Sequence, residues 1–111
     1  MDSINLGNSI AGTMFKSMIS AQPIDGVTLS QMDFSVEVYA LGSPKTKTYR
    51  KDELIYHDEN SYMVTVDSNE LGAGAYWATI TVSIPDDDFS TGVRVEKYEM
   101  PLGVTINRRR R

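Results

Sequence analysis

The sequence contains no cysteine and only one histidine. Without cysteine the chain has no disulfide, no thiol nucleophile and no cysteine-ligated metal, so packing and backbone pairing alone must hold its fold. It also lacks an apolar run of the ~20 residues that a membrane-spanning helix needs. The opening segment MDSINLGNS has neither the basic start nor the apolar stretch of a secretion signal, so we expect a protein that is not exported by the usual route.

What the chain does contain is the composition of one soluble globular domain. It has 111 residues, of which 41% are hydrophobic and 23% charged. A chain of this length forms a single core that buries roughly two-thirds of the surface exposed by the unfolded chain. It shows no internal repeat, no low-complexity linker and no second domain.

Charge is divided unevenly along the chain. Four of the eleven basic residues form a C-terminal run, which leaves seven basic residues against fifteen acidic ones in residues 1–107. The body therefore carries a formal charge of −8 and the run one of +4. Such a run is suited to an acidic surface on a neighbouring copy or another protein, and it is a weak footprint for nucleic acid. The run consists of Arg108, Arg109, Arg110 and Arg111.

Alternation of apolar and polar residues with a period of two recurs through the middle and the end of the chain. No segment keeps the helical i, i+3, i+4, i+7 pattern for more than about two turns. Residues 33–40 and 61–67 place apolar side chains on one face and polar side chains on the other, as half-buried strands do. The segment ELIY, residues 53–56, is predicted to pair with residues 62–66 through the turn HDENS.

Three further segments complete the predicted strands. Residues 12–21 fit either a helical turn or a strand, and the flanking glycines favour a strand. Residues 45–48 are expected to form an exposed edge whose lysines discourage stray pairing. A last strand after residue 92 is expected to be interrupted at Pro101 and Gly103, which implies an edge strand or a bulge. About seven strands separated by turn residues predict a small β-sandwich.

Three stretches carry a resemblance to a known class of module. They are VTLSQMDFSVEVYA (27–40), ENSYMVTVDSNELGAGAYWATITVSIP (59–85) and the closing strand. Their order resembles the immunoglobulin-like (Ig-like) β-sandwich modules of bacteriophage virion proteins, including baseplate and head-fibre components. In addition, IPDDDFSTGVRVEKYEMPLGVTI (84–106) is similar to the endings of small structural proteins from phages of gut Bacteroidales, including crAss-like phages.

The resemblance implies an all-β fold, namely a single small Ig-like antiparallel β-sandwich over residues 12–106. Residues 1–11 would form an N-terminal arm and residues 107–111 a basic tail. The implied location is the virion, assembled in the host cytoplasm. The resemblance supplies no catalytic residue, and the paired cysteines of antibody domains are absent.

The segment ELGAGAY has the chemistry of a corner that leads into a strand. Leu71 can plug the core beneath the turn, and Gly72 and Gly74 can take positive φ angles. Tyr76 can then begin the strand with its ring buried and its hydroxyl bound to a backbone group. We interpret this corner as a folding device without chemistry of its own.

Catalysis has few candidates in this sequence. His57 stands beside Asp58 and Glu59 in a predicted turn, and no serine lies in the G-x-S-x-G context of a nucleophile elbow. We therefore expect a solvated turn histidine, no catalytic residue and a protein that is not an enzyme.

The acidic triplet 86–88, followed by Ser90, places oxygen atoms at alternate positions as calcium loops do. A calcium loop would need glycine where Thr91 stands and glutamate where Lys97 stands, so we expect neither a metal nor another cofactor. The loop is better suited to a basic neighbour, for which the arginine tail of another copy is one candidate.

Trp77 is the only tryptophan, and it falls on the opposite face of its strand from the apolar residues around it. With Thr79 and Thr81 it would lie on an outer sheet face, where a large aromatic side chain is costly unless something covers it. Two explanations remain open at this point. Another subunit or protein covers Trp77, or the N-terminal arm or Met14 and Met18 of the same chain do.

Together these features predict a non-enzymatic structural protein of a phage particle. Its partners would be capsid, portal-collar, fibre or tail proteins and copies of itself, in a homo-oligomer or a larger assembly, with no membrane. The partner-binding residues would be Trp77, Thr79 and Thr81 together with the four terminal arginines. The alternative is a carbohydrate- or host-surface-binding module that uses Trp77, Tyr39 and Tyr98.

Overall fold

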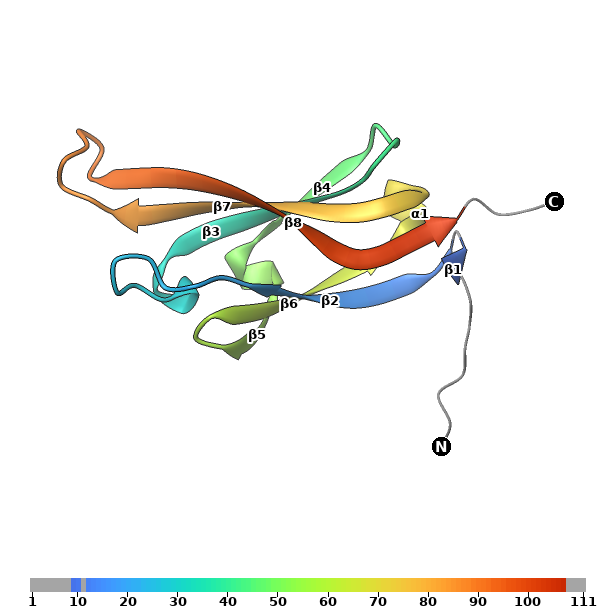
Figure 1. Cartoon of the computed structure of the whole chain (residues 1–111), viewed down its shortest axis with the longest axis horizontal. Coiled ribbons are helices and arrows are strands. Elements are labelled where there is room, and N and C mark those ends of the chain that lie inside the picture. The colour runs from blue at the N-terminus through green and yellow to red at the C-terminus, as the bar shows by residue number, and fades with distance from the viewer. Residues whose placement is uncertain (1–8, 11, 108–111) are drawn as a thin grey trace.

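The computed structural model describes residues 9–10 and 12–107, which form two β-sheets packed face to face (Figure 1). One sheet has five strands in the order β1-β8-β7-β3-β4, and the other has three in the order β2-β6-β5. The strands are β1 (Ser9–Ile10), β2 (Met14–Ser20), β3 (Asp33–Ala40), β4 (Thr46–Arg50), β5 (Ile55–Asp58), β6 (Ser61–Asp67), β7 (Gly74–Pro85) and β8 (Val93–Asn107).

Helical structure is limited to three short pieces among these residues. They are η1 (Leu29–Gln31), η2 (Lys51–Glu53) and α1 (Ser68–Leu71). No helix in the described part of the chain is long and apolar enough to cross a membrane.

The topology confirms the predicted all-β, Ig-like sandwich. All long strands pair antiparallel, and β4 continues through η2 into β5, so the chain passes there from the edge of one sheet to the edge of the other. The five-stranded and three-stranded sheets match the strand arrangement of immunoglobulin-like sandwiches. β1 lies within the expected N-terminal arm and pairs in parallel with β8 at Ile106 and Asn107.

The core lies between the two sheets and follows the predicted alternation. β3 buries every second residue from Phe34 to Ala40, and β7 buries every second residue from Tyr76 to Ile84. β6 covers them with Tyr62, Val64 and Val66 from the second sheet. Because the side-chain period of a strand is two, one face of each strand is committed to the core and the other faces outward.

The predicted hairpin between β5 and β6 is confirmed, but its turn is shorter than expected. β5 runs to Asp58, so His57 lies in the strand and not in the turn as the sequence predicted. A bulge between Tyr56 and Asp58 shifts the register, and the Asp58 carboxylate accepts a hydrogen bond from Asn60 N. This side-chain cap lets two residues, Glu59 and Asn60, make the turn.

β8 continues through Pro101 and Gly103, where an interruption was expected. Trp77 pairs with Pro101 whereas Ala75 pairs with Thr105, so β8 carries two additional residues opposite β7. The proline is therefore accommodated by a bulge, the second form that the sequence allowed.

The predicted corner before β7 is confirmed. Leu71 and Tyr76 are buried, and the Tyr76 hydroxyl donates a hydrogen bond to Gly72 O. Gly72 and Gly74 have φ angles of 94° and 137°. A Cβ atom on Gly74 would lie 2.3 Å from Leu41 O, so only glycine fits where the corner meets the β3–β4 turn.

Replacing Tyr76 by phenylalanine tests the corner. The variant keeps the ring but removes the hydroxyl bound to Gly72 O, so we expect the free energy of unfolding in urea to fall by about 1 kcal/mol. Tyr56→Phe is the matched control, because its hydroxyl binds Glu59 at the exposed surface, so its removal should lower the unfolding midpoint clearly less. Equal midpoints for both variants would show that the corner bond does not stabilise the fold.

Candidate functional site

Trp77 lies on the outer face of the five-stranded sheet, as predicted, and it is half-buried. Its neighbours across the strands are Tyr39 on β3 and Pro101 on β8. Side chains at directly opposed positions are close enough to pack, so Tyr39 and Pro101 flank Trp77 on the same face of the sheet. Thr79 and Thr81 continue the same face, each between a residue of β3 and one of β8.

The suggestion that Met14 and Met18 cover Trp77 is wrong. Both methionines belong to β2 in the three-stranded sheet, on the other side of the core from the outer face that carries Trp77. The N-terminal arm up to residue 8 and the four terminal arginines lie outside the described residues, so their predicted roles stay predictions.

The three aromatic residues suggested for sugar binding do not share one face. The Tyr39 hydroxyl donates a hydrogen bond to the Glu99 carboxylate at 2.9 Å on the Trp77 side, and this bond raises the pKa of Tyr39. Tyr98 pairs with Ile80, a core residue, and therefore faces the other side of the sheet. Trp77 and Tyr39 are thus neighbours, whereas Tyr98 belongs to a different surface.

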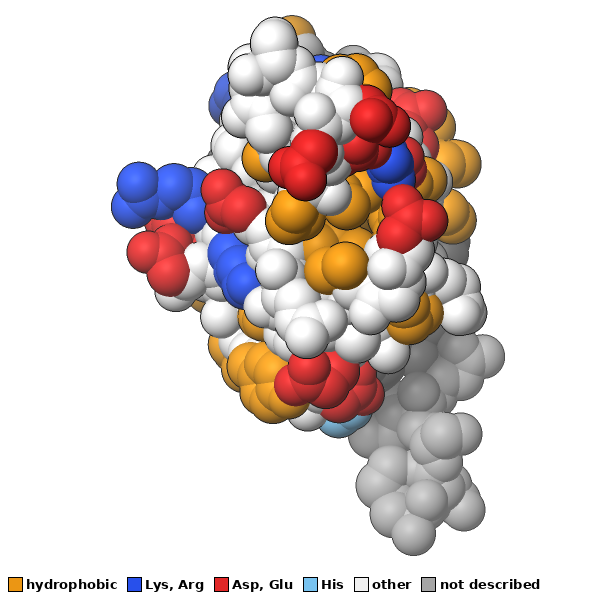
Figure 2. Space-filling view, turned by 90° about the vertical axis from the view of Figure 1, so that its left-hand side faces the viewer, with side chains coloured by type: hydrophobic (Ala, Val, Ile, Leu, Met, Phe, Trp, Pro, Cys, Tyr) orange, Lys and Arg blue, Asp and Glu red, His pale blue; other side chains and the backbone are white. Residues whose placement is uncertain are grey.

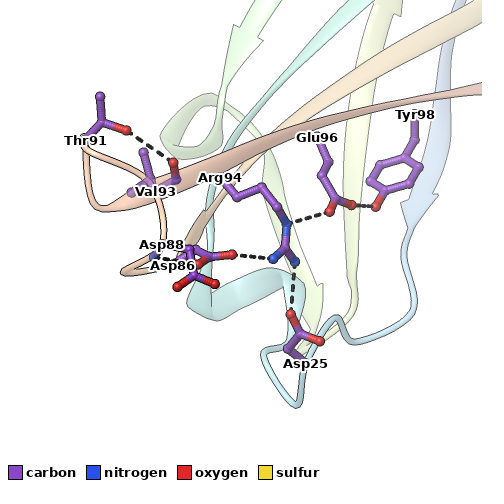
Figure 3. Close-up of polar contacts among 8 residues, drawn as sticks. All are labelled: Asp25, Asp86, Asp88, Thr91, Val93, Arg94, Glu96 and Tyr98. Carbon is purple, nitrogen blue, oxygen red and sulfur yellow. Dashed lines mark hydrogen bonds and ion pairs between the residues drawn. The ribbon is translucent and has the colours of Figure 1, made fainter.

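The far end of the β7–β8 hairpin is held by one arginine (Figure 3). Arg94 Nη2 donates to Asp25 at 2.9 Å, Nη1 donates to Asp86 at 2.6 Å, and Nε donates to Glu96 at 2.7 Å. Glu96 also accepts a hydrogen bond from the Tyr98 hydroxyl. Asp25 lies in the turn that follows β2, so Arg94 ties that turn to β8 and, through Asp86, to the turn between β7 and β8.

Charge and hydrogen bonding in this cluster favour the ionised groups. Hydrogen bonds from Tyr98 and Arg94 lower the pKa of the Glu96 carboxyl. Hydrogen bonds to Asp25, Glu96 and Asp86 raise the pKa of the Arg94 guanidinium. Charge-assisted bonds of this kind are roughly twice as strong as neutral ones, so the cluster acts as a clamp on the hairpin end.

One member of the acidic triplet 86–88, Asp86, is therefore already bound within the chain. Asp86 binds Arg94 through one oxygen and caps Asp88 N through the other. Asp87 and Asp88 remain exposed. Within the described part of the chain, no group of three histidine or carboxylate side chains is arranged to hold a metal ion.

A recess of about 340 Å³ opens beside the clamp, between β8 and the segment that follows β2. Its wall is mostly apolar, and the exposed side chain of Tyr98 forms part of it. It is lined by Ile80 and Val82 of β7, Tyr98, Glu99 and Met100 of β8, Met32, and residues 20–24.

β8 is also the edge of its sheet for most of its length. On the side facing away from β7, β1 pairs with Ile106 and Asn107, and Leu102 O accepts a hydrogen bond from Ser17 Oγ at 3.0 Å. None of the other described strands pairs with residues 93–101 on that side. Alternate residues of this stretch therefore direct their N–H and C=O groups into an open edge, except that Pro101 has no N–H.

The turn between β7 and β8 lies at one end of the sandwich, and β8 ends at the other (Figure 1). Arg94 is the second residue of β8 and therefore belongs to the first end. Figure 2 looks onto the first end and shows acidic side chains around exposed hydrophobic atoms. We call this region, made of Asp25, the triplet 86–88, Glu96 and Glu99, the acidic end.

His57 lies close to one carboxylate. It is exposed on β5, and its Nε2 atom lies 3.9 Å from the Asp58 carboxylate, which is itself exposed.

Comparison with known proteins identifies no relative: neither models of protein families, nor curated proteins, nor solved structures give a match to this chain. The surfaces described above are therefore the only guide to function in the described part of the chain. Of these, the Arg94 clamp and the recess were not predicted from the sequence. The sequence shows the acidic residues near the hairpin, but their pairing with Arg94 depends on how the chain folds.

Removing the Arg94 side-chain charge tests the clamp. Arg94→Gln leaves three carboxylates close together without their cation, so we expect a lower urea midpoint and faster hydrogen exchange at the turn that contains Asp25. Arg50→Gln is the control, because its ion pair with Asp52 is 3.8 Å long and exposed. Equal midpoints for the two variants would contradict a clamp.

The lowered pKa of Glu96 predicts a pH dependence of stability. Its pKa is lower in the folded chain than its ordinary value of 4.5, so the stabilisation is complete above about pH 4.5 and is lost as the pH falls through the folded value. Glu59 adds to this acid limb, because hydrogen bonds from Ser30 and Tyr56 lower its pKa. We expect Glu96→Gln to flatten the limb in part, measured by urea unfolding across this range; a limb parallel to that of the wild type would contradict the assignment.

Proposed function

We propose that this protein is a non-enzymatic assembly protein whose copies associate head to tail. The basic tail of one copy would bind the acidic end of the next. The observation that carries the proposal is the position of these two charged regions at opposite ends of β8. The resemblance noted in the sequence suggests the setting, a structural component of a phage particle that also contacts other virion proteins.

Chain length supports contact between copies over contact within one copy. β8 spans fifteen residues, which corresponds to roughly 45 Å between Val93 and Asn107. A tail of four residues reaches at most about 14 Å beyond Asn107. The tail of one chain therefore falls well short of its own acidic end, whereas a second copy can present that end directly.

A contact between two different surfaces has a consequence for the assembly. Such a heterologous interface leaves one free tail and one free acidic end in every dimer, so association continues into a ring or a filament. This contact reaches the Trp77 face only at Glu99, so Trp77 itself remains available to a lateral partner. Both features fit a component that repeats within a larger particle.

The mass in solution, measured by light scattering, tests the proposal. At low ionic strength we expect oligomers for the full chain and monomers for a chain that ends at Asn107. Raising the salt to about 1 M, where charges are screened within roughly 3 Å, should dissolve the oligomers. Trp77→Ala should assemble like the wild type, because the acidic end reaches that face at Glu99 and not at Trp77.

Two variants of the tail, one with the same charge and one without charge, provide the controls. Replacing the four arginines by lysine should preserve part of the association, and replacing them by glutamine should abolish it. A full chain that stays monomeric at low salt, or a truncated chain that assembles equally well, would contradict the proposed function.

A further inference from the structure

We propose that the open edge of β8, together with the recess beside it, receives the arginine tail of a second copy as an added β-strand. This inference rests on the proposed head-to-tail assembly and specifies its point of contact. The acceptor would be the stretch 93–101, and the donor the four residues that follow Asn107.

The two edges of the five-stranded sheet differ in how well they can accept an added strand. The opposite edge, β4, is only five residues long, and its Lys47 is already paired with Glu70. The open stretch of β8 is longer, and its apolar Val95 is 56% exposed. An exposed edge of this length can pair with an incoming extended segment through backbone hydrogen bonds.

The recess beside β8 can take a side chain of the added strand. Strand addition gains specificity from pockets that take alternate side chains of the incoming strand. The recess lies directly under the open stretch, between Tyr98 and Ile24, and its wall is mostly apolar. An arginine side chain suits it, because the aliphatic stem covers apolar surface while the guanidinium stays at the rim beside the Tyr98 ring.

β8 carries a carboxylate on each of its two faces. Four consecutive arginines in a strand point alternately to the two faces of the sheet. β8 presents Glu96 on the recess face and Glu99 on the Trp77 face. Each carboxylate has acceptor sites beyond the bonds that it makes within the chain, so both can bind an incoming guanidinium.

The donor must come from another copy. Glu99 lies eight residues before Asn107 in β8, which corresponds to about 26 Å along the strand. This is nearly twice the ~14 Å that a four-residue tail can reach. A second copy has no such limit, and its tail carries a charge opposite to that of this end of the molecule.

A labelled peptide with the sequence INRRRR, residues 106–111, tests the site on the chain that ends at Asn107. We expect binding in low salt by fluorescence anisotropy, with slower hydrogen exchange at the amides of residues 94–100. Tyr98→Ser should weaken binding about tenfold, because it removes the wall of the recess. Tyr56→Ser is the matched control: Tyr56 is also exposed and bound to a nearby glutamate, but it lies on β5, and its loss should not change binding.

A peptide of the same charge with N-methylated arginines separates strand addition from simple charge attraction. It cannot donate backbone hydrogen bonds, so we expect its binding to be lost. Equal binding of the two peptides, or unchanged hydrogen exchange in β8, would overturn the proposed site.

The outcomes also separate this inference from the proposed function. If the full chain assembles through its tail but Tyr98→Ser assembles like the wild type, the site is wrong and head-to-tail assembly stands. If the full chain stays monomeric while the peptide protects the β8 amides, the site stands and the proposed function is wrong.

Discussion

The β7–β8 hairpin is longer than the sheet that packs against it, and the rest of the structure follows from this mismatch. β7 has twelve residues and β8 fifteen, whereas β2 and β6 have seven each and β5 has four. The three-stranded sheet therefore cannot cover the whole inner face of the hairpin. The segment between β2 and β3 covers the remainder, with η1 buried at Leu29 and the turn at Asp25 held by Arg94.

This arrangement explains why one end of the molecule differs from the other. At the corner, Tyr76 and Gly74 lock the strands into a closed core. At the hairpin end a loop takes the place of a strand, and a loop leaves a recess where a sheet would fill the space. Because β1 pairs with only the last two residues of β8, the edge above the recess is open as well. Acidic side chains surround exposed hydrophobic atoms at this end, and the proposed contact with a basic tail rests on their charge (Figure 2).

Much of the fold could be predicted from the sequence, because strand position depends on local alternation. Residues 33–40 and 61–67 form strands with the predicted bounds, and the corner before Tyr76 has the predicted bond. The site could not be found in this way. Arg94 and Asp25 are 69 residues apart, and the open edge depends on strand order, which alternation does not determine. The placement of Tyr39 and Pro101 beside Trp77 likewise depends on register.

The central claim is that two different surfaces, a basic tail and the β8 edge, join successive copies. Two variants that are each defective in one surface test it most directly: the chain that ends at Asn107 keeps the edge, and full-length Tyr98→Ser keeps the tail. Each should be monomeric alone, and their mixture should form a dimer that grows no further, as seen by analytical ultracentrifugation. A mixture that stays monomeric, or Tyr98→Ser that forms long oligomers alone, would contradict the account.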